Sequence, residues 1–395
     1  MKMNKIYPIL KQAYRNVRAF YRDCKIFLVD IFCSNQKENI IVCMSMYNNC
    51  YGGSPKAFSD YVLNTYGEKY KVYWAFSYGV NFDTAEDIHK LRVYSWEYYR
   101  IMKKCKYVVS DFRLNKYYLP FKTDSQIYVQ TWHGTALKRI ERDVENTLDK
   151  KYVEDAKWDS QHTDIFIAGS KYMADLYRRS FWYDGEVSII GTPRNDCFYR
   201  VDETKIADIK KKLKIEKSAK IVMFAPTFRK GIEANIAACS IDADRILNKL
   251  TSRFGGVWTM VCRYHPVMVF HSSFKKLIPK SNRVVDATLY PDMQELLEIA
   301  DVLITDYSSS FFDFSLTLRP CFLFGKDYQT YNRGFLLNLD ELPYQFAKTE
   351  RKLYENIENY DETQSQKRIR DFNEKIGMAE NGDSCKKLSI LMGLK

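Results

Sequence analysis

Short apolar runs alternate with helix-length segments along most of this 395-residue chain. The runs are rich in β-branched and aromatic residues, and they lie at 40–44, 71–76, 106–110, 127–132, 164–168 and 187–191, then at 220–225, 257–262, 283–286, 301–305 and 320–324. This alternation indicates βαβ units, in which a parallel sheet carries helices on its faces. Because the chain exceeds the size at which one core keeps growing, we expect two α/β domains.

A polar, lysine-rich stretch at 200–219 separates the two series of runs and predicts a helix that crosses between the halves. We therefore expect one Rossmann-like domain over residues 35–200 and a second over residues 201–395, with a helical, charged tail from about residue 350.

Residues 1–34 are expected to form a separate element. Apolar and aromatic residues recur there at helical spacing, with lysines and arginines between them. A basic amphipathic helix of this kind is typical of contact with an anionic membrane surface. The alternative is a terminal helix docked on the body of the protein with its apolar face buried.

Composition excludes several classes of protein. No run of 18 or more uncharged apolar residues is present, and the N-terminus lacks the apolar core of a signal peptide, so we expect neither a transmembrane helix nor export. The ten cysteines form no CxxC pair and no zinc-like cluster, which predicts a reducing cytoplasm without disulfides or a structural metal. The net charge of +12 favours an anionic partner, such as nucleic acid, a membrane surface or a phosphate-bearing substrate.

Polar and charged residues gather directly after the strand-like runs. In open parallel sheets, ligands bind at the carboxyl ends of the strands, so these residues are candidates for one shared site. They form the segments His133-Gly134, Thr192–Asp196, Pro226–Lys230, Arg263–Pro266 and Asp306–Ser310. No Walker A motif, GxGxxG fingerprint or GxSxG elbow is present, which disfavours a classical dinucleotide enzyme.

His133 is the candidate general base. It ends the run at 127–132, and Gly134 leaves room beside it for a substrate. An imidazole with an ordinary pKa of about 6.5 suits proton abstraction at neutral pH. The alternative is a structural histidine that is satisfied by its neighbours.

Other strand-end residues suit phosphate binding. Arg263 offers a bidentate grip and His265 a hydrogen-bond donor, although His265 can equally be a loop histidine bonded to the backbone. Ser308, Ser309 and Ser310 precede a helix-like segment. They can cap this helix, or they can lie beside free N–H groups at its start that hold a phosphate. Asp196, Asp306 and Asp313 also follow strand-like runs. Their carboxylates can orient a histidine or an acceptor hydroxyl, or they can merely cap a helix.

A set of motifs carries a family resemblance. They are QTWHGTALK, GTPRND, FAPTFR, RYHP, ITDYSSSFFDF and RPCFLFGKDY followed by YNRG. In this order and approximate spacing, over roughly residues 40–345, the chain resembles the CDP-glycerol glycerophosphotransferase family, the teichoic-acid type polyol-phosphate transferases of bacterial envelopes. The resemblance implies a GT-B-like α/β fold, in which two Rossmann-like domains face a cleft and the C-terminal one holds most of the nucleotide.

The resemblance also implies roles for single residues. His133 matches the family's proposed base for the acceptor hydroxyl, and His265 matches a histidine near the donor phosphates. Together, the motifs and the strand ends give a donor- and phosphate-binding set of Thr227, Arg229, Arg263, Ser308, Ser309, Ser310 and Asp313, supported by Gly134, Arg194, Asp196 and Asp306. Two departures from the family are Ala136, in place of a proline, and Pro343-Tyr344, where many members carry Pro-Gly.

These observations predict attack by an acceptor hydroxyl on the β-phosphorus of CDP-glycerol or CDP-ribitol, with release of CMP. His133 accepts the proton, and the phosphate-binding groups stabilise the phosphate oxygens and the leaving group. We expect no cofactor and no metal. The expected partners are the CDP-polyol donor, a lipid-linked glycan acceptor and the anionic inner membrane surface, which places the enzyme in the cytoplasm, peripheral to the membrane.

Two other functions stay open. The first is a GT-B glycosyltransferase that uses a nucleotide sugar, because HP and Ser-Ser motifs also occur in some of these enzymes. The second is a non-catalytic membrane- or nucleic-acid-binding protein, which does not explain the residues at the strand ends; we expect no nucleic-acid partner. The sequence leaves open the polyol, the acceptor, the oligomeric state, wall teichoic acid versus capsule, and single addition versus polymerisation. The short N-terminal region is compatible with a single-addition enzyme.

Overall fold

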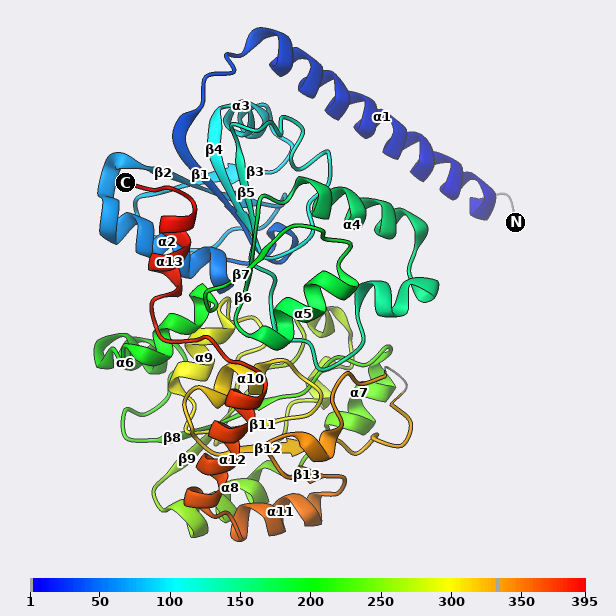
Figure 1. The fold of residues 1–395 in the computed structure, drawn as a ribbon. Helices are drawn as coiled ribbons and strands as arrows, with labels where there is room; N and C mark the ends of the chain where they lie inside the picture. Colours follow the sequence, from blue (N-terminus) through cyan, green and yellow to red (C-terminus); the bar gives the residue numbers. More distant parts are fainter. Residues whose placement is uncertain (1–2, 332–333) are drawn as a thin grey trace.

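The computed structural model describes residues 3–331 and 334–395, with side chains in the first helix described from residue 10. Asn332 and Arg333 of the YNRG motif lie outside the described residues. The chain forms two parallel sheets that occupy separate halves of the molecule (Figure 1).

The first sheet has the strand order β3-β2-β1-β4-β5-β6-β7, and every pairing in it is parallel. Its strands are β1 (Glu38–Met44), β2 (Lys71–Phe76), β3 (Ile88–Arg92), β4 (Cys105–Ser110), β5 (Ile127–Gln130), β6 (Ile165–Ala168) and β7 (Val187–Ile189). The α-helices of this half are α1 (Met3–Phe32), α2 (Gly53–Tyr66), α3 (Trp96–Lys104), α4 (Lys150–His162) and α5 (Lys171–Ser180). The strand order reverses between β1 and β4, so the carboxyl ends of these two strands form the topological switch point.

The second sheet has the order β10-β9-β8-β11-β12-β13 and is also entirely parallel. Its strands are β8 (Lys220–Ala225), β9 (Trp258–Cys262), β10 (Val284–Asp286), β11 (Val302–Thr305), β12 (Cys321–Phe324) and β13 (Phe346–Ala347). The remaining α-helices are α6 (Glu203–Lys212), α7 (Ile232–Cys239), α8 (Ala243–Phe254), α9 (Met293–Ile299), α10 (Ser310–Ser315), α11 (Glu350–Glu358), α12 (Glu362–Lys375) and α13 (Ser384–Leu391). Here the order reverses between β8 and β11.

Alternation along β1 shows how the sequence builds these layers. Ile41 and Cys43 pack with side chains of α2 and α13 on one face, whereas Ile40 and Val42 pack with α3 on the other. Both faces of the sheet are therefore covered, which explains why the strands read as nearly continuous apolar runs. The second sheet has α6, α9, α10 and α12 on one face and α8 and α11 on the other.

The predicted runs are all strands, with ends that differ by a few residues. The prediction omitted β3, an edge strand of sequence IHKLR whose charged residues hide its alternation, and β13, which has only two residues. The strand predicted over 127–132 ends at Gln130 because Trp132 has a φ of 52°, in the left-handed region that cannot continue a strand.

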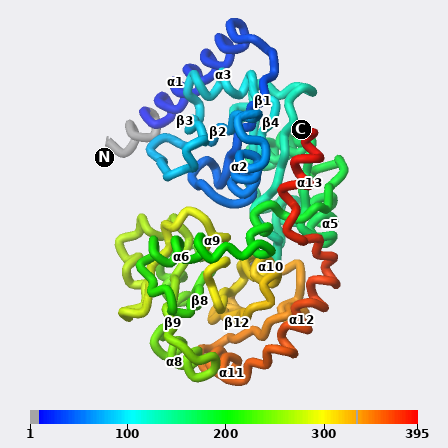
Figure 2. The backbone as a smooth tube through the Cα atoms, turned by 90° about the vertical axis from the view of Figure 1, so that its left-hand side faces the viewer, coloured from blue at the N-terminus to red at the C-terminus, as the bar shows by residue number. Residues whose placement is uncertain are grey.

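The chain returns to the first half at its C-terminus. Figures 1 and 2 both show α13 beside α2, far from the second sheet. The Tyr66 hydroxyl on α2 donates to Ser389 Oγ on α13 at 3.1 Å. Helix α13 thus adds to the layer over the first sheet, while the domain boundaries at residues 34 and 200 remain predictions.

Helix α1 extends away from the first half, as Figure 1 shows at the N-terminus. Its last turns dock on the body, since Val29 is buried and Lys103 on α3 donates to the Asp30 carboxylate at 3.0 Å. Leu10, Val17 and Phe20, which lie nearer the N-terminus of the helix, are 62%, 67% and 71% exposed. The predicted helix is confirmed. Of the two alternatives given for it, docking on the body of the protein describes its last turns. Within residues 3–331 and 334–395, no helix is long and apolar enough to cross a membrane.

Candidate active site

A cavity of about 480 Å³ lies between the two sheets, and the loops after β1, β4, β5, β8, β9 and β11 supply its wall. Both topological switch points therefore open into it. The predicted residues that line it are His133, Arg194, Thr227, Arg263, His265, Ser308, Ser309, Ser310 and Asp313. Side chains separated by up to 180 positions in the sequence thus meet at one site, as the strand-end argument predicted.

His133 has a defined tautomer. Its Nδ1 lies 2.8 Å from the backbone carbonyl oxygen of Asp111. A carbonyl only accepts, so Nδ1 donates, and Nε2 of the neutral ring carries a lone pair. Desolvation by the surrounding protein lowers the pKa of His133. The ring is therefore neutral at neutral pH, with a proton acceptor on a side chain that lines the cavity.

A strained turn presents this ring. Trp132, whose φ is 52°, stacks on His133 with ring centroids 4.2 Å apart. The fully buried Gln130 holds the turn, because its Oε1 accepts from the Trp132 N–H at 2.9 Å and its Nε2 donates to the Phe112 carbonyl at 3.1 Å. A bulky residue in the left-handed region costs about 1–2 kcal/mol, and such strain concentrates at functional sites.

Gly134 permits a close approach of the two halves. A Cβ atom on Gly134 would lie 2.6 Å from Ser309 Oγ and 3.0 Å from Ser309 Cβ. Residues 135–140 have the sequence TALKRI, which is compatible with a helix, but they form a loop in the structure. Its backbone bonds to the other half instead: Leu336 N–H donates to Leu137 O at 2.8 Å, and Arg139 N–H donates to Gly334 O at 2.8 Å.

His265 has the opposite tautomer to His133. Its Nδ1 accepts the Val267 N–H at 3.3 Å, so the proton of the neutral ring resides on Nε2. Desolvation, followed by the nearby Arg263 charge, lowers the pKa of His265. His133 therefore offers a hydrogen-bond acceptor at its Nε2, and His265 offers a hydrogen-bond donor at its own Nε2.

The serines and Arg263 complete the wall on the second half. Ser308 Oγ accepts from the Ser310 N–H at 3.2 Å and from the Ser310 hydroxyl at 2.9 Å, whereas Ser309, which precedes α10, makes no side-chain capping bond. The Arg263 Nη1 donates to the carbonyls of Ala287 at 2.9 Å, Thr288 and Tyr290. These bonds hold the guanidinium against the loop after β10, at the cavity edge.

Arg194 and Asp313 form a buried ion pair between the halves. Arg194 Nε and Nη2 each donate to the Asp313 carboxylate at 3.0 Å. Asn195 and Gln294 add donors to the same carboxylate at 3.1 and 3.0 Å. The pair joins the segment after β7 to α10, and both of its residues line the cavity.

Four predicted residues do not line the cavity: Gly134, described above, and the three that follow. Arg229, grouped above with the donor-binding residues, instead pairs with Asp306 at 2.8 Å and Asp327 at 2.5 Å, which holds the loops after β8, β11 and β12 together. Asp306 also accepts the Thr227 N–H at 2.9 Å. Asp196 accepts the N–H groups of Ser384 and Cys385 at 3.0 and 2.8 Å and so caps α13. Arg229, Asp306 and Asp196 therefore lie behind the cavity wall and hold its loops and α13 in place.

The sequence reasoning missed Asp111 and Ser45. The buried Asp111 carboxylate accepts the Ser45 hydroxyl at 2.6 Å and the Met46 N–H at 2.9 Å, while its backbone carbonyl holds His133. Burial raises the pKa of Asp111 to about 6. Both residues directly follow strands at the switch point, so the strand-end rule, applied to the runs 40–44 and 106–110, would have found them.

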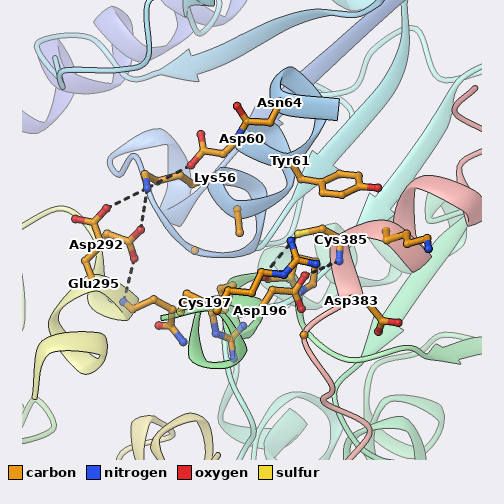
Figure 3. Close-up of a pocket in the computed structure, with 18 of the residues that line it drawn as sticks. Lys56, Asp60, Tyr61, Asn64, Asp196, Cys197, Asp292, Glu295, Asp383 and Cys385 are labelled. Carbon is orange, nitrogen blue, oxygen red and sulfur yellow. Dashed lines mark hydrogen bonds and ion pairs between the residues drawn. The ribbon is translucent and has the colours of Figure 1, made fainter. Parts of the chain in front are cut away.

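Figure 3 shows a second pocket, of about 380 Å³, which adjoins the cavity because Gly53, Arg194, Asp292 and Gln294 line both. Lys56 on α2 lies there within 3.5 Å of Asp60 and Asp292 and 3.1 Å of Glu295. Asp292 and Glu295 belong to the α9 region of the second half, so these ion pairs tie the halves together beside the cavity.

The fold and the cavity define a two-domain α/β protein of GT-B-like architecture, with the cleft at the carboxyl ends of both sheets. A family model described as CDP-glycerol:poly(glycerophosphate) glycerophosphotransferase matches residues 26–391. The chain therefore belongs to this family, and the resemblance seen in the motifs is confirmed.

Relatives of known name agree with this assignment. The chain is 29% identical over 372 residues to the teichoic acid poly(glycerol phosphate) polymerase of Staphylococcus epidermidis, covering 91% of this chain and 51% of the relative. It is 30% identical over 333 residues to the Bacillus subtilis polymerase, covering 81% of this chain and 44% of the relative. The chain thus spans about half the length of these two relatives.

A third relative and a solved structure match at nearly full length. The teichoic acid glycerol-phosphate transferase of Staphylococcus aureus is 26% identical over 339 residues, with 82% of this chain and 85% of the relative covered. The wall teichoic acid polymerase TagF, as a variant soaked with CDPG, superposes with a TM-score of 0.80 at 27% identity over 97% of each chain. The GT-B-like fold is confirmed.

Proposed function

We propose that this protein transfers glycerol phosphate or ribitol phosphate from a CDP-polyol to a hydroxyl of a lipid-linked envelope glycopolymer, at the cytoplasmic face of the membrane. The observation that carries this proposal is the pair of opposite tautomers across one cavity: His133 with an acceptor at Nε2, and His265 with a donor. Family membership and the names of the relatives support the donor class.

The proposed step is an in-line displacement at the β-phosphorus. His133 Nε2 takes the proton from the acceptor hydroxyl as its oxygen attacks. The bond from the β-phosphorus to the bridging oxygen breaks, CMP leaves with that oxygen, and a phosphodiester forms. The His265 Nε2–H, the hydroxyls of Ser308–Ser310 and the charge of Arg263 stabilise the phosphate oxygens and the leaving group.

Release of CMP tests the proposal. The wild-type protein is incubated with CDP-glycerol or CDP-ribitol, with or without a short lipid-linked glycan mimic, and UDP-sugars serve as controls. We expect CMP release from one CDP-polyol that depends on the acceptor. Turnover of a UDP-sugar in place of either CDP-polyol would favour a glycosyltransferase of the same fold.

The same proposal includes contact of α1 with an anionic membrane. A groove of about 890 Å³ runs between α1 and the first domain, lined by cations that include Arg15, Arg18, Arg22 and Arg92. None of the described residues that line it is Asp or Glu. Exposed apolar side chains lie along the same helix, α1, as expected for a helix that lies in the headgroup region of a membrane.

Charge reversal on α1 should release the protein from anionic vesicles. Each basic residue near such a surface contributes about 1 kcal/mol, so we expect Arg15→Glu with Arg18→Glu to weaken binding by at least about tenfold. Co-sedimentation with phosphatidylglycerol vesicles measures this. Lys211→Glu with Lys212→Glu, on the exposed side of α6, is the matched control. Equal loss in both double variants would contradict a role specific to α1.

Adding a methyl group at Gly134 should impair catalysis. The alanine Cβ would meet Ser309 Oγ at 2.6 Å, so the loop that carries His133 must move away from the second domain. A displacement of this kind lowers kcat/KM by about 100-fold. CMP release measures the effect, and Gly134→Ala with Ser309→Gly should recover part of it. A fully active Gly134→Ala variant would rule out this close approach in the working enzyme.

A further inference from the structure

We propose that Lys138 is a further catalytic residue, whose ammonium group binds the distal phosphate of the donor, the phosphate that is transferred. This inference rests on the proposed function and deepens it, because it adds a cation to the groups that hold the reacting phosphate. Lys138 lies in the loop that follows β5 and begins at His133, the proposed base.

The segment that carries Lys138 is held by the second half of the molecule. Residues 137–139 pair with residues 334–336 through an antiparallel bridge and two backbone hydrogen bonds of 2.8 Å. Leu137 is 1% exposed and belongs to the hydrophobic cluster that contains side chains of α10 and β12. Lys138 therefore counts as part of the donor-side wall, although it follows a strand of the first sheet in the sequence.

The extended backbone of this segment directs Lys138 into the cavity. Successive side chains of an extended segment point to opposite sides. Leu137 points into the core of the second half, so Lys138 points away from that core, and it lines the cavity. The same loop touches the donor-side wall, since a Cβ atom on Gly134 would lie 2.6 Å from Ser309 Oγ. The ammonium group thus shares the cavity with the serines that are proposed to hold the donor phosphates.

The arginines of the cavity are engaged by protein groups. Arg194 donates two hydrogen bonds of 3.0 Å to the Asp313 carboxylate, which offsets its charge. Arg263 uses its Nη1 on three backbone carbonyls at the cavity edge. Catalysis of phosphoryl transfer consists mainly of positioning and of electrostatic stabilisation of the phosphoryl oxygens. A lysine ammonium, a compact cation on a flexible stem, suits this task, and Lys138 brings one into the cavity.

The position of Lys138 on the loop assigns it to the distal phosphate. His133 begins the same loop, and the hydroxyl that it activates attacks the distal phosphorus, so this phosphate is the part of the donor nearest the loop. In the step, the acceptor oxygen bonds to phosphorus, the bond to the bridging oxygen breaks, and the electron pair leaves with CMP. Lys138 exchanges no proton, and its charge stabilises the phosphoryl oxygens.

Titration of the protein with CDP-glycerol and with CMP, together with the kinetics of CMP release, tests this role. Lys138→Met removes the charge and keeps an unbranched side chain, so we expect about tenfold weaker binding of CDP-glycerol, the loss of one bond to a charged group. Binding of CMP, which lacks the distal phosphate, should match the wild type. The kcat should fall by about 100- to 1000-fold, as for the loss of one donor that stabilises a transition state.

Arg139→Met is the matched control. Arg139 is the next residue of the same segment, is exposed and does not line the cavity, and its backbone bond remains in the variant. This variant loses the same charge and should keep wild-type affinity and kcat. Both variants should keep the melting temperature of the wild type, because neither substitution removes a buried side chain.

Wild-type kcat in Lys138→Met would overturn the inference. An equal loss of CDP-glycerol and CMP affinity would also overturn it, because Lys138 would then act on the nucleotide or on the fold. A similar loss of kcat in Arg139→Met would do the same, because the net charge of the loop would be the cause.

Titration of the wild type with CDP-glycerol, CDP-ribitol and UDP-glucose separates this inference from the proposed function. If the wild type and Lys138→Met turn over a CDP-polyol equally well, the proposed function stands and the inference fails. If only UDP-glucose binds, the proposed function fails. The comparison of UDP-glucose with UMP then decides whether Lys138 binds the distal phosphate of the donor.

Discussion

Replacing His133 with alanine is expected to lower kcat for CMP release by about 100- to 10,000-fold, the usual contribution of a general base. The substitution removes the Nε2 lone pair that Asp111, through its carbonyl, holds in place. The affinity for CDP-glycerol should change little, because the groups proposed to bind the donor phosphates lie on the second domain. Steady-state kinetics with a lipid-linked acceptor, together with titration of the donor, separates the two effects.

His162→Ala is the matched control for His133→Ala. His162 also stacks on a tryptophan, Trp158, and its Nδ1 lies 2.7 Å from the Trp158 carbonyl, but it does not line the cavity. This variant should keep wild-type kcat. A His133→Ala enzyme with more than about half of the wild-type kcat would remove His133 from the role of base.

The pH dependence of kcat follows from the same residue. A base works in its neutral form, so activity is lost as the pH falls through its pKa. Desolvation by the protein around the cavity lowers the pKa of His133 from the ordinary value of 6.5, so the enzyme should stay active below the pH at which a free histidine would be protonated. The acid limb of the kcat profile measures this, and a limb above pH 6.5 would contradict it.

Replacing Asp313 with alanine is expected to destabilise the fold by about 3–5 kcal/mol, the cost of leaving a buried charge without its partner. The Asp313 carboxylate receives both bonds of Arg194 and further bonds from Asn195 and Gln294. Arg194 would lose the acceptor of both bonds, whereas Asn195 and Gln294 would each keep one other acceptor. Because the pair joins the two domains, the urea midpoint should fall, and CMP release should fall with it.

Two variants test whether the ion pair itself is the cause. Arg194→Met with Asp313→Leu removes both charges, so the double variant should be more stable than Asp313→Ala. Glu355→Ala removes the partner of Arg351, whose side chain is 90% exposed, and should hardly change the midpoint. A double variant as unstable as Asp313→Ala would mean that packing, and not the buried charge, dominates.

Local patterns predicted most of the secondary structure. The runs at 40–44 and 220–225 are strands because apolar residues with β-branched side chains suit a sheet that is covered on both faces. β3 could not be recognised, because the edge strand carries charged residues that no periodicity rule reads as buried. Residues 135–140 looked helical but form a loop, because their backbone bonds to residues 334–336, a contact that local propensity does not contain.

The residues of the candidate site were likewise predicted only in part from the sequence. The strand-end rule found His133, His265 and the serines, because the carboxyl ends of parallel strands must share one edge. It could not separate Thr227, which lines the cavity, from Arg229, which pairs with Asp306 behind it. Both belong to one loop, and only packing decides which side chain turns inward.

The sequence by itself determined the α/β class, the two sheets, the family and the residues that collect at the strand ends, because these depend on periodicity and motif order along the chain. Only the tertiary structure decided the tautomers of His133 and His265 and the buried pair of Arg194 and Asp313. The physical reason is that hydrogen bonding and desolvation depend on which atoms become neighbours in space. Residues 119 positions apart, as in the buried pair, become neighbours only when the domains are folded and packed.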